Sequence, residues 1–180
     1  MKTLKNFPSL VIALALAVVC TAAEPVEKKP AAAPLALLGF LTANEWTATL
    51  PDGPDGKKIS IHARFSWAEN HQAIRVSNQF IVNGKSTPYI DGLYIWHPEK
   101  GAILFWYADA AGNLSEGSVK MEDGKLVHEF QEIHGDGKAQ SLVARVTPLP
   151  NGEGWDNEIL ARKDGVLKPV VQVRYLADKK

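Results

Sequence analysis

The sequence predicts an all-β protein: a single antiparallel up-and-down β-barrel of about ten strands, with a short N-terminal helical or plug segment. The first observation behind this prediction is alternation. Between Ile59 and Trp67 every second residue is apolar, which is the period of a half-buried strand and not of a helix. Residues 74–82, 142–146 and 171–175 alternate in the same way. No stretch after Asn44 carries a convincing helical stripe.

The second observation is regular turn punctuation. Asn-Gly and Asp-Gly pairs suit the left-handed backbone positions of tight hairpins, so they typically separate antiparallel strands. Nine turn signals imply about ten short strands, and closure into a barrel would leave no exposed sheet edge. The signals lie at residues 52–56, 69–71, 83–84, 98–101, 109–113, 123–124, 135–137, 150–152 and 164–165.

The N-terminal residues 1–23 are typical of a signal peptide. Lys2 and Lys5 precede the apolar stretch Leu10–Val19, and small residues follow at the expected cleavage site. We therefore expect an exported protein, periplasmic or extracellular, without a stable membrane span after cleavage. A retained anchor is one alternative. A lipid anchor through Cys20 is another, although Val19 occupies the position where a lipobox requires a small residue.

The remaining chain divides into a linker and one domain. Residues 24–36 are rich in Pro, Ala and charge, which predicts an extended linker. Residues 37–178 form the predicted barrel domain, and the apolar segment Leu35–Leu41 predicts the helix or plug that leads into it. Cleavage would remove Cys20, the chain's one cysteine, so no disulfide can stabilise the mature domain. About 150 residues can bury a sufficient apolar core.

Charge and motifs exclude several functions. Twenty basic and twenty acidic residues give a formal net charge of +0, which argues against a nucleic-acid binder. The sequence contains no GxSxG, GxGxxG, P-loop, HExxH or CxxC pattern. A non-enzymatic protein is therefore favoured. The enzymatic alternative is a cavity isomerase or cyclase in which Asp91 pairs with His97 or His128.

The hairpin of residues 89–109 is unusually aromatic. It holds six of the chain's fifteen aromatic residues, and both faces of both strands are apolar. A barrel strand needs only one apolar face, so the second face requires a cover. That cover could be Leu35–Leu41, a second subunit, a membrane surface or a ligand. A dimerising interaction module that uses this hairpin is therefore an alternative function.

Several of these features resemble the lipocalin-like, or calycin, barrels. They are an apolar lead-in, Trp46 early in the first strand, and the segments Asp91–Pro98 and Phe105–Asp109, which are similar to uncharacterised secreted bacterial members of that group. The chain departs from the lipocalins proper at Asn44, where they carry Gly. The resemblance implies a meandering barrel and a contact between Trp46 and an Arg of the last strand, here Arg174.

A barrel of this kind favours binding of a small apolar or amphipathic molecule. Aromatic residues suit such a cavity because they add apolar area with few rotatable bonds. We expect no cofactor and no metal. Haem is the alternative cofactor, with His128 as axial ligand because residues 170–176 contain no His; His128, Glu132 and His134 are the alternative metal ligands. Arg64 and Arg75 should face solvent. The predicted ligand-binding residues are Trp46, Tyr94, Trp96, Phe105 and Trp106, with His128 as the orienting polar group.

Overall fold

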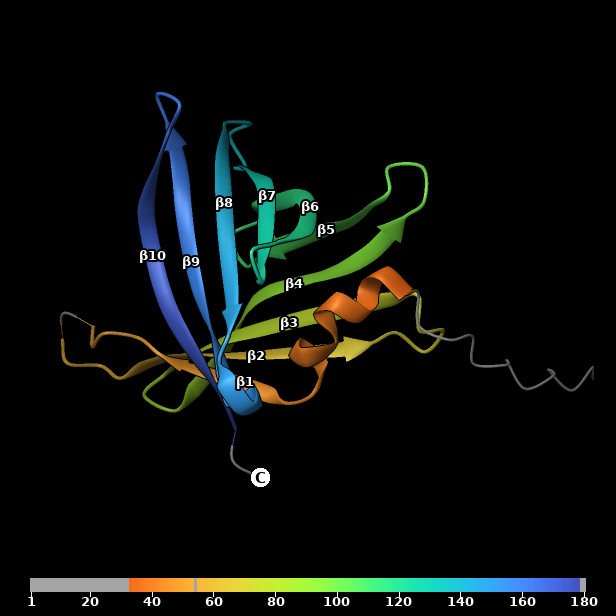
Figure 1. The fold of residues 1–180 in the computed structure, drawn as a ribbon. Helices are drawn as coiled ribbons and strands as arrows, with labels where there is room; N and C mark the ends of the chain where they lie inside the picture. The colour runs from red at the N-terminus through yellow and green to blue at the C-terminus, as the bar shows by residue number, and fades with distance from the viewer. Residues whose placement is uncertain (1–32, 54, 179–180) are drawn as a thin grey trace, which may run out of the picture.

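The computed structural model describes residues 33–53 and 55–178 (Figure 1). The predicted signal peptide, Cys20 and most of the predicted linker lie outside the described residues. Within the described ranges, no helix is both long and apolar enough to cross a membrane.

Ten antiparallel strands form one closed barrel, which confirms the predicted fold class. Each strand pairs with its sequence neighbours, and the first pairs with the last to close the barrel. The elements are η1 (Ala33–Thr42), β1 (Glu45–Thr49), β2 (Ile59–Trp67), β3 (Ala73–Val82), β4 (Lys85–His97), β5 (Ala102–Asp109), β6 (Leu114–Glu122), β7 (Lys125–Ile133), β8 (Ala139–Pro148), η2 (Pro150–Gly152), β9 (Gly154–Lys163) and β10 (Val166–Ala177).

The nine predicted turns lie at the nine connections between strands. The tightest are two-residue hairpins, and both residues of each have positive φ. Asn83 and Gly84 have φ values of 49° and 77°, and Asp123 and Gly124 have 46° and 76°. These are the left-handed conformations that Asn, Asp and Gly tolerate best. The turn chemistry of the sequence therefore determines the strand boundaries.

Most strands alternate between the barrel interior and solvent, as the period of two predicts, whereas β5, β7 and β8 each bury three consecutive residues. In β2, Ile61, Ala63 and Phe65 are buried, whereas Arg64 between them is exposed. Gly117 lies where β6 approaches β7 closely at a bend of the barrel wall. A Cβ atom at this position would overlap the backbone of β7 at Phe130. Glycine within a strand is typical of such barrel bends.

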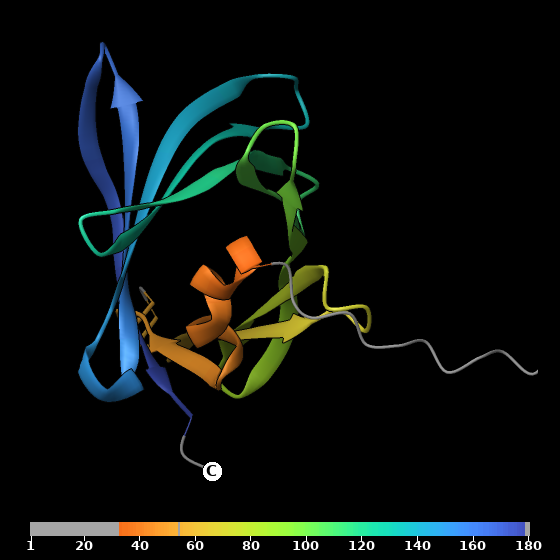
Figure 2. The ribbon, with the colours of Figure 1, turned by 45° about the vertical axis from the view of Figure 1, so that its right-hand side comes forward.

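The helix η1 is a plug, as one of the sequence interpretations predicted, although it begins at Ala33, within the predicted linker. A 3-10 helix has about three residues per turn, so Leu35, Leu38 and Leu41 line one face. All three are at most 2% exposed and belong to the main core cluster. Figure 2 shows η1 (orange) within the curve of the barrel wall. In Figure 1, where the strands are labelled, it lies near the ends of β2 and β4.

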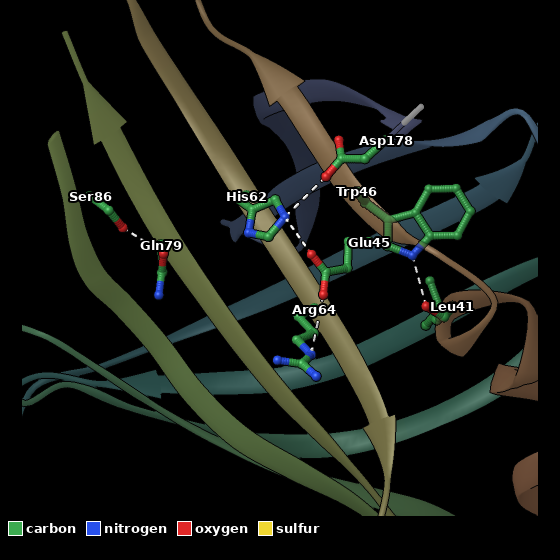
Figure 3. Close-up of polar contacts among 8 residues, drawn as sticks. All are labelled: Leu41, Glu45, Trp46, His62, Arg64, Gln79, Ser86 and Asp178. Carbon is green, nitrogen blue, oxygen red and sulfur yellow. Dashed lines mark hydrogen bonds and ion pairs between the residues drawn. The ribbon is translucent and has the colours of Figure 1, made fainter. Parts of the chain in front are cut away.

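We call the barrel end where β2 and β4 finish the plugged end. Its core is aromatic: Trp155 stacks on Tyr175 with ring centroids 3.9 Å apart and meets Trp46 edge to face at 6.4 Å. The indole Nε1 of Trp46 donates a 2.7 Å hydrogen bond to the carbonyl oxygen of Leu41 (Figure 3). This bond joins the plug to the first strand.

The opposite end is the far end, where β3 finishes and β4 begins. Its inward-facing aromatic residues Phe80, Tyr89 and Phe130 are only partly buried, although all three pack against the main core. The rings of Phe80 and Tyr89 lie 4.1 Å apart. The interior is thus densely packed at the plugged end and more accessible at the far end.

Candidate functional site

The centre of the candidate site is His128, the one buried polar residue in the described part of the chain. It lies in β7, and its Nε2 is 2.9 Å from the hydroxyl of Tyr94 in β4. Two strands separate β4 from β7. Gly117, on the intervening β6, contributes no side chain. The hydrogen bond therefore joins two walls of the barrel across its inner surface.

Aromatic rings surround this pair. The ring of Phe105 in β5 lies 5.3 Å from the His128 ring and 5.7 Å from those of both Tyr94 and Phe130. The ring of Tyr107 lies 5.6 Å from the Tyr94 ring, nearly perpendicular to it. We call these five residues, Tyr94, Phe105, Tyr107, His128 and Phe130, the interior cluster.

The interior cluster carries no charge at neutral pH. Burial lowers the pKa of His128 to about 4, so its imidazole is neutral. Burial also raises the pKa values of Tyr94 and Tyr107 well above the ordinary tyrosine value, so both phenols keep their protons. The cluster can therefore offer hydrogen bonds from neutral groups, but no ion pair.

Among the described residues, four buried side-chain atoms have no hydrogen-bond partner: His128 Nδ1, Asn78 Oδ1, Trp155 Nε1 and Asn157 Oδ1. All four residues occupy inward positions. Asn78 pairs with the buried Ala63, and Asn157 pairs with the buried Val146 and Val173. Buried polar atoms normally find a partner, since leaving one without a hydrogen bond costs about 1–3 kcal/mol. The barrel interior thus has unused capacity for hydrogen bonds.

The structure brings together three of the predicted ligand-binding residues, Tyr94, Phe105 and His128. Trp46 and Trp96 also face inward but pack at the plugged end, and Trp46 already uses its indole N–H. The placement of Trp106 needs correction: it lies on the outer face, 36% exposed. Successive strand residues point to opposite faces, so Trp106 must oppose Phe105. Sequence could not choose between them because both faces are apolar.

Sequence reasoning missed Tyr107 and Phe130 in the interior cluster. The available signal was the alternation of faces along a strand. Tyr107 lies two residues after Phe105, and Phe130 lies two residues after His128, so each shares the face of its partner. Trp155 and Asn157 had no comparable signal, since the polar Asn157 and the apolar Leu160 break the alternation of residues 154–163.

Three pairings that were alternatives, or were implied by the lipocalin resemblance, do not form among the described residues. Asp91 is exposed on the outer face while His128 is interior, so these two cannot act as an acid–base pair. His134 follows the last residue of β7, and its Nε2 lies 3.8 Å from Glu132 Oε2; among the described residues these two do not form a group of metal donors with His128. Arg174 lies on the outer face and binds Asp156 at 2.7 and 2.9 Å. Strand parity therefore keeps it away from the interior Trp46.

A shallow polar groove marks the outer face of β1 to β4, with a volume of about 740 Å³. Its lining includes Arg64, Arg75 and Asp91, and both arginines are exposed, as the sequence predicted. The groove is separate from the interior cluster because the strands of the barrel wall lie between them.

Comparisons with known proteins support the fold alone. No family model matches the chain, and no curated protein matches it either. Among solved structures, the chain is similar to the crystal structure of Rv2717c from M. tuberculosis, with a TM-score of 0.53 and 13% sequence identity. The match covers 83% of this chain and 100% of that one. The chain is therefore a closed ten-strand antiparallel β-barrel with a distant structural neighbour.

Proposed function

We propose that this protein is an exported, non-enzymatic barrel that binds a small, uncharged amphipathic molecule at the interior cluster, as its resemblance to lipocalin-like barrels implies. The unpartnered His128 Nδ1 is the observation that carries the proposal. Tyr94 holds the other ring nitrogen, so Nδ1 is left to bond a ligand. Because the imidazole is neutral, a hydroxyl or carbonyl group suits it better than a carboxylate.

The size and lining of the barrel favour this function. A barrel of about eight strands is already wide enough to hold one small ligand, and this one has ten. Phe105 and Phe130 supply apolar area beside His128, and the partly exposed Phe80 and Tyr89 lie at the far end. We expect the ligand to enter at the far end, because η1 occupies the other one.

Native mass spectrometry of gently purified protein tests the proposal, with an absorbance scan alongside. We expect a monomer that carries extra non-covalent mass. A Soret band would identify haem as the occupant and contradict an uncharged organic ligand. A neutral apolar dye, N-phenyl-1-naphthylamine, then tests the site: His128→Phe should weaken its binding at least tenfold, and Trp106→Ala on the outer face should not. Equal effects of the two variants, or no binding at all, would refute the proposal.

A specific observation also favours the second candidate, a homodimer through the aromatic hairpin. Leu93, Ile95 and Trp106 lie on the outer face of β4 and β5 and are 36–38% exposed. Leu93 and Trp106 are direct cross-strand neighbours. The plug covers inward-facing residues and leaves this face exposed; under this candidate, a second copy of the chain covers it. If this candidate is right, Trp106→Ala should halve the mass measured by light scattering. A monomeric mass for both the unmodified protein and the variant would exclude the homodimer.

A further inference from the structure

Three potential metal ligands meet where the barrel closes. Glu45 begins β1, His62 lies in β2, and Asp178 directly follows β10. The backbone N–H of Asp178 donates a 3.0 Å hydrogen bond to the carbonyl oxygen of Glu45, which sets the position of Asp178. Glu45 and His62 share the outer face, because both alternate with the inward-facing Trp46 and Ala63. Figure 3 shows the three side chains pointing toward one another.

The donor atoms have the spacing of a metal centre. His62 Nε2 lies 3.0 Å from Asp178 Oδ2 and 3.3 Å from Glu45 Oε2. One donor atom from each residue lies within 4.8 Å of the other two. An ion held tetrahedrally at about 2.1 Å keeps its ligands roughly 3.4 Å apart. Small side-chain adjustments would therefore fill three of the four coordination positions of such an ion.

We propose that Glu45, His62 and Asp178 bind a divalent transition-metal ion of the zinc class. The imidazole nitrogen disfavours magnesium and calcium, which prefer oxygen ligands alone, and suits zinc and its neighbours. Three protein ligands leave a fourth position for water. Arg64 Nε lies 3.4 Å from Glu45 Oε1, so it orients the carboxylate while Oε2 remains directed at His62. Such a second contact is typical of metal-binding carboxylates.

The ion would stabilise the closure of the barrel. Glu45 belongs to the first strand and Asp178 follows the last, so one ion would connect the two elements that complete the sheet. The unfolded chain cannot hold these residues together, and an ion that binds only the folded state raises its stability. This inference is independent of ligand binding at the interior cluster, because the barrel wall separates the two sites.

The test uses the full chain without an affinity tag, stripped with a chelator and titrated with ZnCl2 in a calorimeter. We expect one equivalent of zinc to bind the unmodified protein. His62→Gln and Asp178→Asn should each weaken binding at least tenfold. At free zinc about one hundred times the Kd, the melting temperature should rise by about 5–10 °C, and both variants should lose this shift.

His134→Gln is the matched control, because His134 is also partly exposed beside the carboxylates of Glu132 and Asp136 but does not belong to the group of three donors within 4.8 Å of one another. It should keep the affinity and the thermal shift of the unmodified protein. Asp178→Asn lies beyond the last strand, so it preserves the test if His62→Gln fails to fold. The absence of stoichiometric zinc binding would show that the three residues form only an ion pair and would overturn the inference. Binding that persists in both variants would overturn it as well.

Discussion

Leu38→Ala should destabilise the protein far more than Leu37→Ala, although the two substitutions are chemically identical and lie side by side in η1. Leu38 is 0% exposed and belongs to the main core cluster, whereas Leu37 is 42% exposed. The difference arises from the three-residue period of the 3-10 helix, which turns Leu38 toward the core and Leu37 toward solvent. The pair therefore isolates the energetic contribution of the plug.

The magnitude follows from burial. Truncation of a fully buried Leu to Ala costs about 2–5 kcal/mol, because apolar contacts are lost and a cavity is left. An exposed substitution usually stays within about 0.5 kcal/mol. For a domain of this size, Leu38→Ala should lower the melting temperature by about 5–15 °C.

Urea unfolding, followed by tryptophan fluorescence and by far-ultraviolet circular dichroism, measures both variants. The plug contacts the indole of Trp46 through Leu41, so fluorescence reports on its docking and dichroism reports on the sheet. We expect the two signals to change together. If Leu38→Ala costs no more than Leu37→Ala, the plug is not part of the core and the reasoning is refuted. A separate early fluorescence transition would show that the plug undocks before the barrel unfolds.

Two further predictions concern a titratable group and two glycines. The unfolded chain binds a proton on His128 near pH 6.5, but the folded protein does so only near pH 4. Stability should therefore fall between pH 6.5 and 4, by up to about 3 kcal/mol. Urea unfolding at several pH values should show that His128→Gln removes this loss. If the free energy of unfolding falls equally with pH in the variant and in the unmodified protein, the prediction is wrong. Gly92→Ala would place its Cβ against the Trp106 carbonyl and should cost about 3 kcal/mol or more. Gly39→Ala meets no neighbour within 4 Å and should stabilise by about 0.4–1 kcal/mol; similar melting temperatures for the two glycine variants would refute the packing argument.

The fold could be predicted from the sequence because the patterns that indicate it are local. The alternation in Ile59–Trp67 and the turn pairs such as Asn83-Gly84 depend on neighbouring residues alone, so they are legible in the sequence. Ten strands and nine turns follow from them, as does the antiparallel arrangement. The plug was also predictable as an apolar segment, but its start at Ala33 was not, because packing stabilises a helix that extends into the linker.

The candidate site was predictable only in part. Tyr94, Phe105 and His128 were expected as ligand-binding residues, and they do lie together. Trp106 was assigned to the wrong face because residues 89–109 are apolar on both faces. The local alternation is equally consistent with either face pointing inward. Only the pairing of β4 and β5 within the closed barrel decides which face is interior.

The sequence by itself thus determined the fold class, the turns and the inward faces of the strands with one apolar side. The tertiary structure decided which distant residues meet. Tyr94 and His128 are 34 residues apart, and His62 and Asp178 are 116 apart. Such contacts depend on strand register and barrel closure, which are long-range properties that no local pattern of residues encodes.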